Sequence, residues 1–259
     1  MTTSELKDEI VSFVRTHFDV MIVMATSAIS LIGLHYYVIG YGLTGRPFSA
    51  DFLWVLEQLG ILEQLDLSPR LLDLIGWSFG CFAVYVVIPM TVLALCRKKP
   101  SEYGWNVHGL FGHMPIYLAM YIVVGIALVC VSFRKDFQNY YPFYKNPISW
   151  RELLIWEFVY ALQFISLEFF FRGFLVHGLK EKLGGISAVC VMMFPYLMIH
   201  FGKPWLESMG AFIAGAILGT VSLRTGSIGG GAVVHIMVAW SMDLTALWQQ
   251  GWFSKQIPW

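Results

Sequence analysis

The stretch FISLEFFFRGFL, residues 164–175, places an acid and a base inside one of the most apolar parts of the chain. Glu168 precedes Arg172 by four residues, so on a helix both side chains lie on one face and offset each other's charge. Ionisable groups at membrane depth are costly and usually mark a site or a pathway, with a structural ion pair between helices as the alternative. The stretch therefore predicts a membrane-embedded helix that carries a polar site.

The composition of the 259 residues is that of a polytopic membrane protein. Hydrophobic residues make up 57% of the chain and charged residues 13%, whereas soluble domains average about 25% charged residues. The mean hydropathy is +0.64. The 17 basic and 17 acidic side chains balance, so no basic excess indicates nucleic-acid binding. The four cysteines match no zinc pattern, and we expect them to be small core residues.

A membrane-spanning helix needs about 20 mostly apolar residues, and the chain has seven candidate segments. Residues 44–73 are too charged to span, but within them 49–65 has apolar residues at helical spacing opposite Glu57 and Glu63. We expect an interfacial amphipathic helix there. Between the fifth and sixth candidate segments, we expect Pro204 to end the fifth helix. The sequence thus predicts an all-α, polytopic transmembrane bundle in one domain, residues 1–259. The predicted spans are 20–43, 74–96, 110–133, 154–175, 186–200, 209–223 and 227–248.

Two of the later apolar segments each carry one histidine, His200 and His235. Either one alone is typical of a hydrogen-bonded core residue. Together with Glu168, in separate spans, they favour a shared polar site within the bundle. Glu157 lies three helical turns before Glu168, close to two tryptophans that are typical of a membrane–water boundary. We therefore expect Glu157 to be solvated.

Three chemistries suit a carboxylate, a guanidinium and two imidazoles in a protected cavity. The first is hydrolysis, in which the glutamate or a histidine takes a proton from water and the other groups stabilise the oxyanion. The second is a catalytic zinc site, for which two histidines and one glutamate are a known ligand set; the chain has no H-E-x-x-H sequence. The third is a proton or ion pathway through a transporter, although no second copy of the Glu168 segment exists.

The segment LEFFFRGFL, residues 167–175, resembles the E-E-x-x-x-R-G motif of the CPBP family of intramembrane proteases. That family includes the type 2 CAAX prenyl proteases and the bacterial Abi proteins. His200 within FPYLMIHFGKP, the turn RTGSI at 224–228 and then His235 follow in the family's order. The likeness covers residues 150–243, which we expect to form the catalytic core, and the first half of the chain is similar only in hydropathy.

The departures from the family pattern fall on the chemistry. The first glutamate of the motif, taken as the water-activating base, is Leu167 here, and Glu168 takes the second position. Tyr196 stands where the family's F-x-x-x-H element has phenylalanine, and Ala239 replaces the amide of the H-x-x-x-N element. Glu207 could supply the missing carboxylate, but we expect a helix-start residue. Either Glu168 works with the two histidines, or the scaffold persists without hydrolysis.

The resemblance implies an intramembrane endopeptidase that cuts near the C-terminus of a membrane-associated or lipid-modified protein or peptide. Its catalytic set would be Glu168, Arg172, His200 and His235, with Arg172 orienting Glu168 and keeping it ionised. It implies no organic cofactor; if a metal such as zinc takes part, His200, His235 and Glu168 would be its ligands. The partners would be that substrate and the lipid bilayer, without nucleic acid, in a prokaryotic plasma (inner) membrane. The alternatives are a catalytically impaired scaffold or bacteriocin immunity protein and, third, a transporter.

Overall fold

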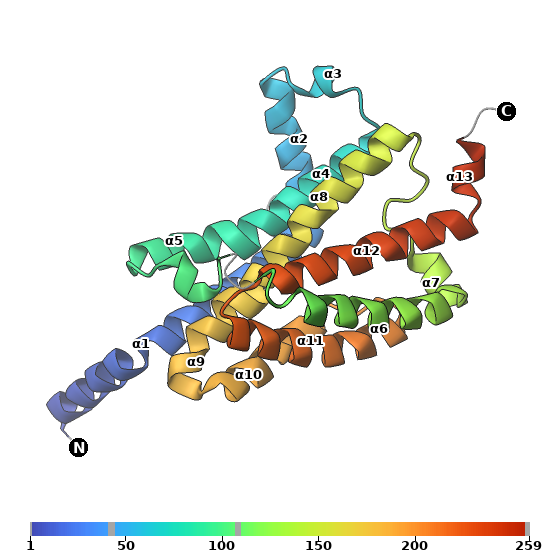
Figure 1. Cartoon of the computed structure of the whole chain (residues 1–259). Coiled ribbons are helices and arrows are strands. Elements are labelled where there is room, and N and C mark those ends of the chain that lie inside the picture. The colour runs from blue at the N-terminus through green and yellow to red at the C-terminus, as the bar shows by residue number, and fades with distance from the viewer. Residues whose placement is uncertain (1, 41–44, 107–109, 257–259) are drawn as a thin grey trace.

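The computed structural model of the chain describes residues 2–40, 45–106 and 110–256. It is 81% helical, and no strand occurs in those ranges, so the predicted all-α membrane bundle is confirmed. Figure 1 shows most of the long helices packed side by side, with the N-terminal half of the first helix extending beyond the bundle.

Within the described ranges, six helical segments are long and apolar enough to cross a membrane. The six segments are α1 (Thr3–Gly33) with η1 (Leu34–Ile39); α4 (Pro69–Phe82) with η2 (Ala83–Val87) and α5 (Ile88–Leu95); α6 (Met114–Ser132); α8 (Trp150–Glu168) with η4 (Phe169–His177) and α9 (Gly178–Leu183); α11 (Trp205–Thr225); and α12 (Gly229–Gln249). The three segments that combine several elements change helix type along their length but continue without a break.

The remaining described helices are shorter. The apolar α10 (Gly185–Met198) leads into α11, and the others are α2 (Phe48–Gln58), α3 (Leu62–Leu65), η3 (Pro100–Tyr103), α7 (Lys135–Tyr140) and α13 (Trp252–Lys255). Six of the seven predicted spans thus correspond to helices of spanning length. The remaining predicted span, 186–200, forms α10, whose 14 residues are too few to cross the hydrocarbon core of a bilayer.

Two boundary expectations from the sequence are wrong. The amphipathic segment 49–65 is not one helix, because Gly60 adopts a left-handed backbone with φ of 66° and separates α2 from α3. Pro204 does not end α10, which stops at Met198; it caps the start of α11 instead. Proline suits that position because the first turn of a helix needs no donor from it.

The N-termini of α4 and α8 are tied together by one carboxylate. Ser68 and Ser149 cap the two helices, each with its hydroxyl accepting from a main-chain N–H of the first turn. Glu152 in the first turn of α8 accepts from the main-chain N–H of Ser68 at 2.6 Å, from its hydroxyl at 2.9 Å, and from the Tyr144 hydroxyl. Burial and the bond to Glu152 raise the pKa of Tyr144 to about 12, so it remains a donor.

The segment that decides the fold lies at the centre of the bundle. Around η4, the side chains of Phe169, Phe170, Phe171 and Phe174 are completely buried. They pack with residues of α1, α4, η2 and α10 in the largest apolar cluster of the described chain. The wide π-helical turns of η4 begin directly after Glu168, and such turns occur frequently at functional sites.

The glycine-rich start of α12 lets that helix approach α6 closely. A Cβ atom at Gly230 would overlap the ring of Tyr117 on α6. We expect Gly230→Ala to lower the free energy of unfolding by about 1–3 kcal/mol through overpacking, read as a lower thermal midpoint in detergent. Gly125→Ala on α6 is the control, because a Cβ there meets nothing within 4 Å. Equal midpoints for the two variants would contradict this packing.

Candidate active site

A single carboxylate oxygen joins the acid of α8 to the base of η4 and to a histidine of α12. The Nδ1–H of His235 donates to Glu168 Oε1 at 2.9 Å, and Arg172 Nη1 lies 3.2 Å from the same oxygen. Glu168 and Arg172 are completely buried, whereas the His235 side chain keeps 16% of its surface exposed. The pair expected from the four-residue spacing therefore forms, and His235 completes it.

The backbone of α12 and an aromatic ring of α8 hold this group in place. A Cβ atom at Gly231 would come within 2.7 Å of Glu168 Oε2, so any larger residue there would displace the carboxylate from its present position. One turn further along α12, the imidazole of His235 packs on the ring of Phe164, with centroids 4.7 Å apart. The bond to Glu168 and this ring fix both the tautomer and the orientation of His235.

His200 joins the site through Tyr196. The guanidinium of Arg172 lies over the Tyr196 ring at 3.9 Å from its centroid, a cation–π contact. The same ring meets the His200 imidazole edge to face, with centroids 4.7 Å apart. The Nδ1–H of His200 donates to the Tyr196 carbonyl at 2.8 Å, which leaves its Nε2 as an acceptor.

The structure therefore connects all four residues of the expected site, in the order His235, Glu168, Arg172 and His200. Sequence reasoning noted Tyr196 only as a departure from the family's phenylalanine and missed its contact with Arg172. It also missed Phe164 and Gly231. The only sequence signal for them was their position: Phe164 is one helical turn before Glu168, and Gly231 one turn before His235.

Several polar atoms at this site have no hydrogen-bond partner among the described residues. They are Glu168 Oε2 and the guanidinium nitrogens of Arg172, of which Nη1 has only the ion pair with Glu168 Oε1, and each atom is fully removed from solvent. Unsatisfied buried polar groups are rare and call for a functional explanation. A carboxylate oxygen can accept a proton, and guanidinium N–H groups can donate to a developing oxyanion.

The two substituted motif positions are apolar in structure as well as in sequence. Leu167 is buried in the large cluster around η4. Ala239, one turn beyond His235 on α12, is buried in a second apolar cluster with Trp156, Tyr160 and Phe164. Neither position carries a polar group that could take over the role of the family's first glutamate or of its amide.

The donor set does not fit a metal ion. Among the described residues, no three His, Cys, Asp or Glu side chains are grouped so that they could bind one. In addition, Oε1 of Glu168 and Nδ1 of His235 are bonded to each other, and the Arg172 cation lies 3.2 Å from the same oxygen. A second cation there would be repelled.

The expectation that Glu157 is solvated is wrong. Its side chain is buried, and neither carboxylate oxygen has a hydrogen-bond partner among the described residues. It faces the seam between α8 and α12, where Trp240 Nε1 donates to its main-chain carbonyl. Asp243 of α12, also fully buried, accepts from the main-chain N–H of Phe143 and from Trp156 Nε1.

Glu207 is a helix-start residue of α11, as expected, and it belongs to a polar network at the end of the loop that carries His200. It accepts from Lys203 Nζ and from the Tyr141 hydroxyl, both at 2.8 Å. Burial disfavours the charged form of Lys203, but Glu207 outweighs it and raises the pKa of Lys203. Burial, assisted by the negative charge of Glu207, raises the pKa of Tyr141. Lys203 and Glu207 thus form a stable ion pair.

Removing the Arg172 side chain should leave the buried carboxylate of Glu168 without its cationic partner. We expect Arg172→Ala to destabilise the fold by about 3–5 kcal/mol, because Glu168 keeps only His235 as a partner. The double variant Glu168→Gln with Arg172→Met removes both charges and should recover most of that loss. Thermal unfolding in detergent measures both. A double variant no more stable than Arg172→Ala would show that the two side chains are not energetically coupled.

Comparison with known protein families gives one match, in the second half of the chain. The family model described as Type II CAAX prenyl endopeptidase Rce1-like matches residues 149–241. No curated protein and no solved structure matches the chain. The matched segment includes Glu168, Arg172, His200 and His235, while residues 1–148 lie outside it. The resemblance expected from the motifs is therefore confirmed over residues 149–241, which are similar to the Rce1-like type II CAAX prenyl endopeptidases.

Proposed function

We propose that the protein is an intramembrane endopeptidase that hydrolyses a peptide bond near the C-terminus of a membrane-associated or lipid-modified protein or peptide. The observation that carries this proposal is the Glu168–His235 hydrogen bond beside Arg172 at the centre of a membrane bundle. A carboxylate that orients an imidazole is the arrangement that activates water or a hydroxyl in hydrolases. The family match supports the class of reaction.

In this proposal Glu168 and His235 act as one unit. Because Nδ1 of His235 donates to Glu168, the neutral imidazole presents a lone pair on Nε2. A water molecule at Nε2 gives up a proton as its oxygen bonds to the substrate carbonyl carbon. The imidazolium then returns the proton to the leaving amine while the C–N bond breaks. Glu168 offsets the positive charge on the ring during the intermediate stage.

Arg172 and His200 have supporting roles in this scheme. The guanidinium carries N–H groups without hydrogen-bond partners among the described residues, and these suit the oxyanion that forms on the attacked carbonyl. Its contact with the Tyr196 ring keeps it beside Glu168. His200, which packs edge to face with the same ring, would also contact the substrate.

The expected substrate and location follow from the membrane setting. A site on η4 at the centre of the bundle is reached by a segment that is itself held at the membrane, so a lipid-modified or membrane-anchored polypeptide is the partner we propose. The six apolar helices indicate an integral membrane protein, and we propose a prokaryotic plasma membrane as its location.

A non-catalytic scaffold, such as an immunity protein of the same fold, is the second candidate. The burial of Leu167 and Ala239 in apolar clusters favours it, because two polar positions of the family motif have become part of the packed interior. Under this alternative, Glu168 and Arg172 remain as a structural ion pair that orders η4.

Glu168→Gln separates these two candidates. An amide cannot hold the charge that orients and stabilises His235, so we expect cleavage of an S-prenylated or C-terminally anchored peptide to fall at least about 100-fold. The measurement is peptide turnover by purified protein, with thermal unfolding as a check on folding. If the variant folds and keeps its cellular function, the scaffold candidate is correct.

His235→Gln should lower turnover by a similar factor, because it removes the Nε2 base. His177→Gln is the matched control. His177 is also a buried histidine whose side chain has hydrogen bonds, to the Ser222 hydroxyl at 3.0 Å and to Lys180 Nζ at 3.2 Å, and neither partner is one of the four site residues. Equal losses in both variants would indicate a shared structural effect and contradict a catalytic His235.

A further inference from the structure

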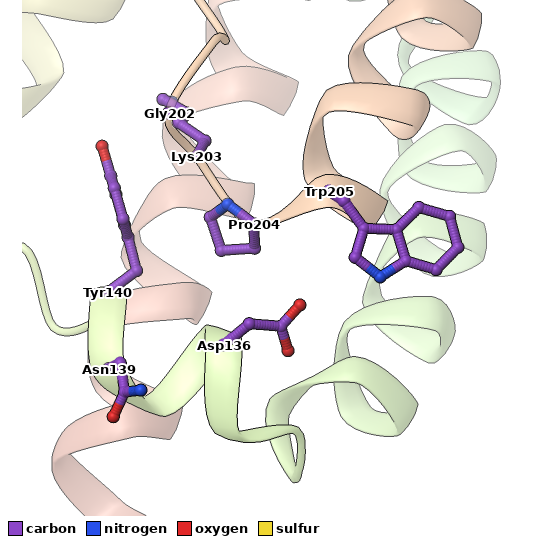
Figure 2. Close-up of a pocket in the computed structure, with 7 residues that line it drawn as sticks. All are labelled: Asp136, Asn139, Tyr140, Gly202, Lys203, Pro204 and Trp205. Carbon is purple, nitrogen blue, oxygen red and sulfur yellow. The ribbon is translucent and has the colours of Figure 1, made fainter.

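A pocket of about 330 Å³ opens where α7 faces the loop between α10 and α11. Figure 2 shows the Asp136 carboxylate of α7 beneath Pro204 of the loop. The charged groups of the lining, Asp136 and Lys203, have opposite signs, and Lys203 is already paired with Glu207. This lining favours no single class of ligand.

Two buried carboxyl groups lie at the seam between α8 and α12. Glu157 of α8 and Asp243 of α12 are about two to three helical turns from the candidate active site, along the same two helices. The helices are bonded to each other here in both directions. Trp240 Nε1 donates to the main-chain carbonyl of Glu157 at 3.0 Å, and Trp156 Nε1 donates to Asp243 Oδ2 at 2.9 Å. Glu157 and Asp243 are close enough to interact electrostatically.

The two carboxyl groups differ in their hydrogen bonds. Asp243 has a donor on each oxygen, because the main-chain N–H of Phe143 reaches Oδ1 at 2.7 Å and the Trp156 indole reaches Oδ2. Lys145 adds a positive charge near Asp243. Glu157 is only 7% exposed, and neither of its carboxylate oxygens has a hydrogen-bond partner in the described part of the chain. Asp243 is therefore suited to remain ionised, whereas a charge on Glu157 would be uncompensated.

The other groups that face this part of the seam do not supply a cation to Glu157. Lys145 acts on Asp243, and the group that acts on Glu157 is Asp243 itself, which is acidic. The α4 side chains that pack here are apolar: Leu71, Leu74, Ile75 and Trp77. The titratable side chains around the two carboxyl groups are Tyr160 on α8, Glu207 on α11, and Tyr140, Tyr144 and Lys145 from α7 and the segment after it.

We propose that the seam between α8 and α12 is a proton-binding site, in which Glu157 is a neutral carboxylic acid near neutral pH beside the Asp243 carboxylate. Protonation removes the uncompensated charge and gives Glu157 an O–H donor. When the proton passes to solvent, two like charges face each other across the seam, and their repulsion loosens it.

The candidate active site depends on the same two helices. His235 of α12 donates to Glu168 of α8 at 2.9 Å, so this bond and the cross-bonds at Glu157 and Asp243 hold one helix pair together at two points. Loosening the seam at one point weakens the other. The proton on Glu157 is therefore a pH-sensitive support for the Glu168–His235 contact.

Infrared difference spectra of the full-length protein in lipid nanodiscs test for the proton. Near neutral pH, the unmodified protein should show a carboxylic C=O stretching band that Glu157→Gln lacks, because an ionised carboxylate has no such band. Glu181→Gln is the matched control: it makes the same change at an exposed glutamate of α9 and should keep the band. Asp243→Asn removes the neighbouring negative charge, so Glu157 should lose its proton at a lower pH.

Thermal midpoints over about pH 6–9 test the effect on the fold. In the unfolded chain Glu157 is ionised over this range, whereas in the folded chain it holds a proton. Stability should therefore fall as the pH rises, by up to about tenfold in the folding equilibrium constant per pH unit. Glu157→Gln should remove this part of the pH dependence, and Glu181→Gln should keep it.

Three outcomes would overturn the proposal. The first is a carboxylic band near neutral pH that is the same in the unmodified protein and in Glu157→Gln. The second is an equal fall of the thermal midpoint with pH in those two proteins. The third, which holds even where Glu157→Gln does not fold, is a band whose loss with pH is unchanged by Asp243→Asn. Neither measurement uses peptide cleavage, so the result does not depend on the proposed protease.

Discussion

The buried carboxylate of Glu168 is the constraint on which the centre of this bundle depends. An ionised carboxylate away from water is tolerated only when charged and hydrogen-bonded partners surround it. Arg172 and His235 meet on its Oε1, and each comes from a different part of the second half of the chain. Holding the carboxylate therefore fixes η4 against α12. The Tyr196 ring beneath Arg172 extends the same constraint to α10 and to the loop that carries His200.

The parts of this arrangement that follow from local sequence could be predicted. The four-residue spacing of Glu168 and Arg172 predicts their pairing because the chain is helical there, and six of the seven apolar runs correspond to helices of spanning length. Features that depend on contacts between distant segments could not be predicted. Glu157 reads as an interfacial acid from its tryptophan neighbours, yet α12 packs over it and buries it. Gly60 looks like any residue of an amphipathic repeat until its left-handed backbone separates α2 from α3.

The same distinction applies to the site. The motif order predicted which histidines belong to the candidate site, whereas the residues that they contact depend on packing. Nothing in the sequence shows that Gly231 must lack a side chain to admit Oε2 of Glu168, or that Tyr196 lies between Arg172 and His200. The length of α10 illustrates the limit for hydropathy: its residues are as apolar as those of a span, but the helix stops at Met198.

The substitution at Leu167 also changes the charge balance of the site. With two glutamates beside one arginine, the group would carry a net negative charge, which favours a protonated imidazole nearby. With Glu168 alone, the carboxylate and Arg172 neutralise each other, and His235 can stay neutral while its Nδ1–H is still held. A neutral imidazole has a lone pair on Nε2 and can therefore act as the base in place of a glutamate at position 167. The loss of one carboxylate is therefore compatible with hydrolysis, provided that the base is the imidazole which the remaining carboxylate orients.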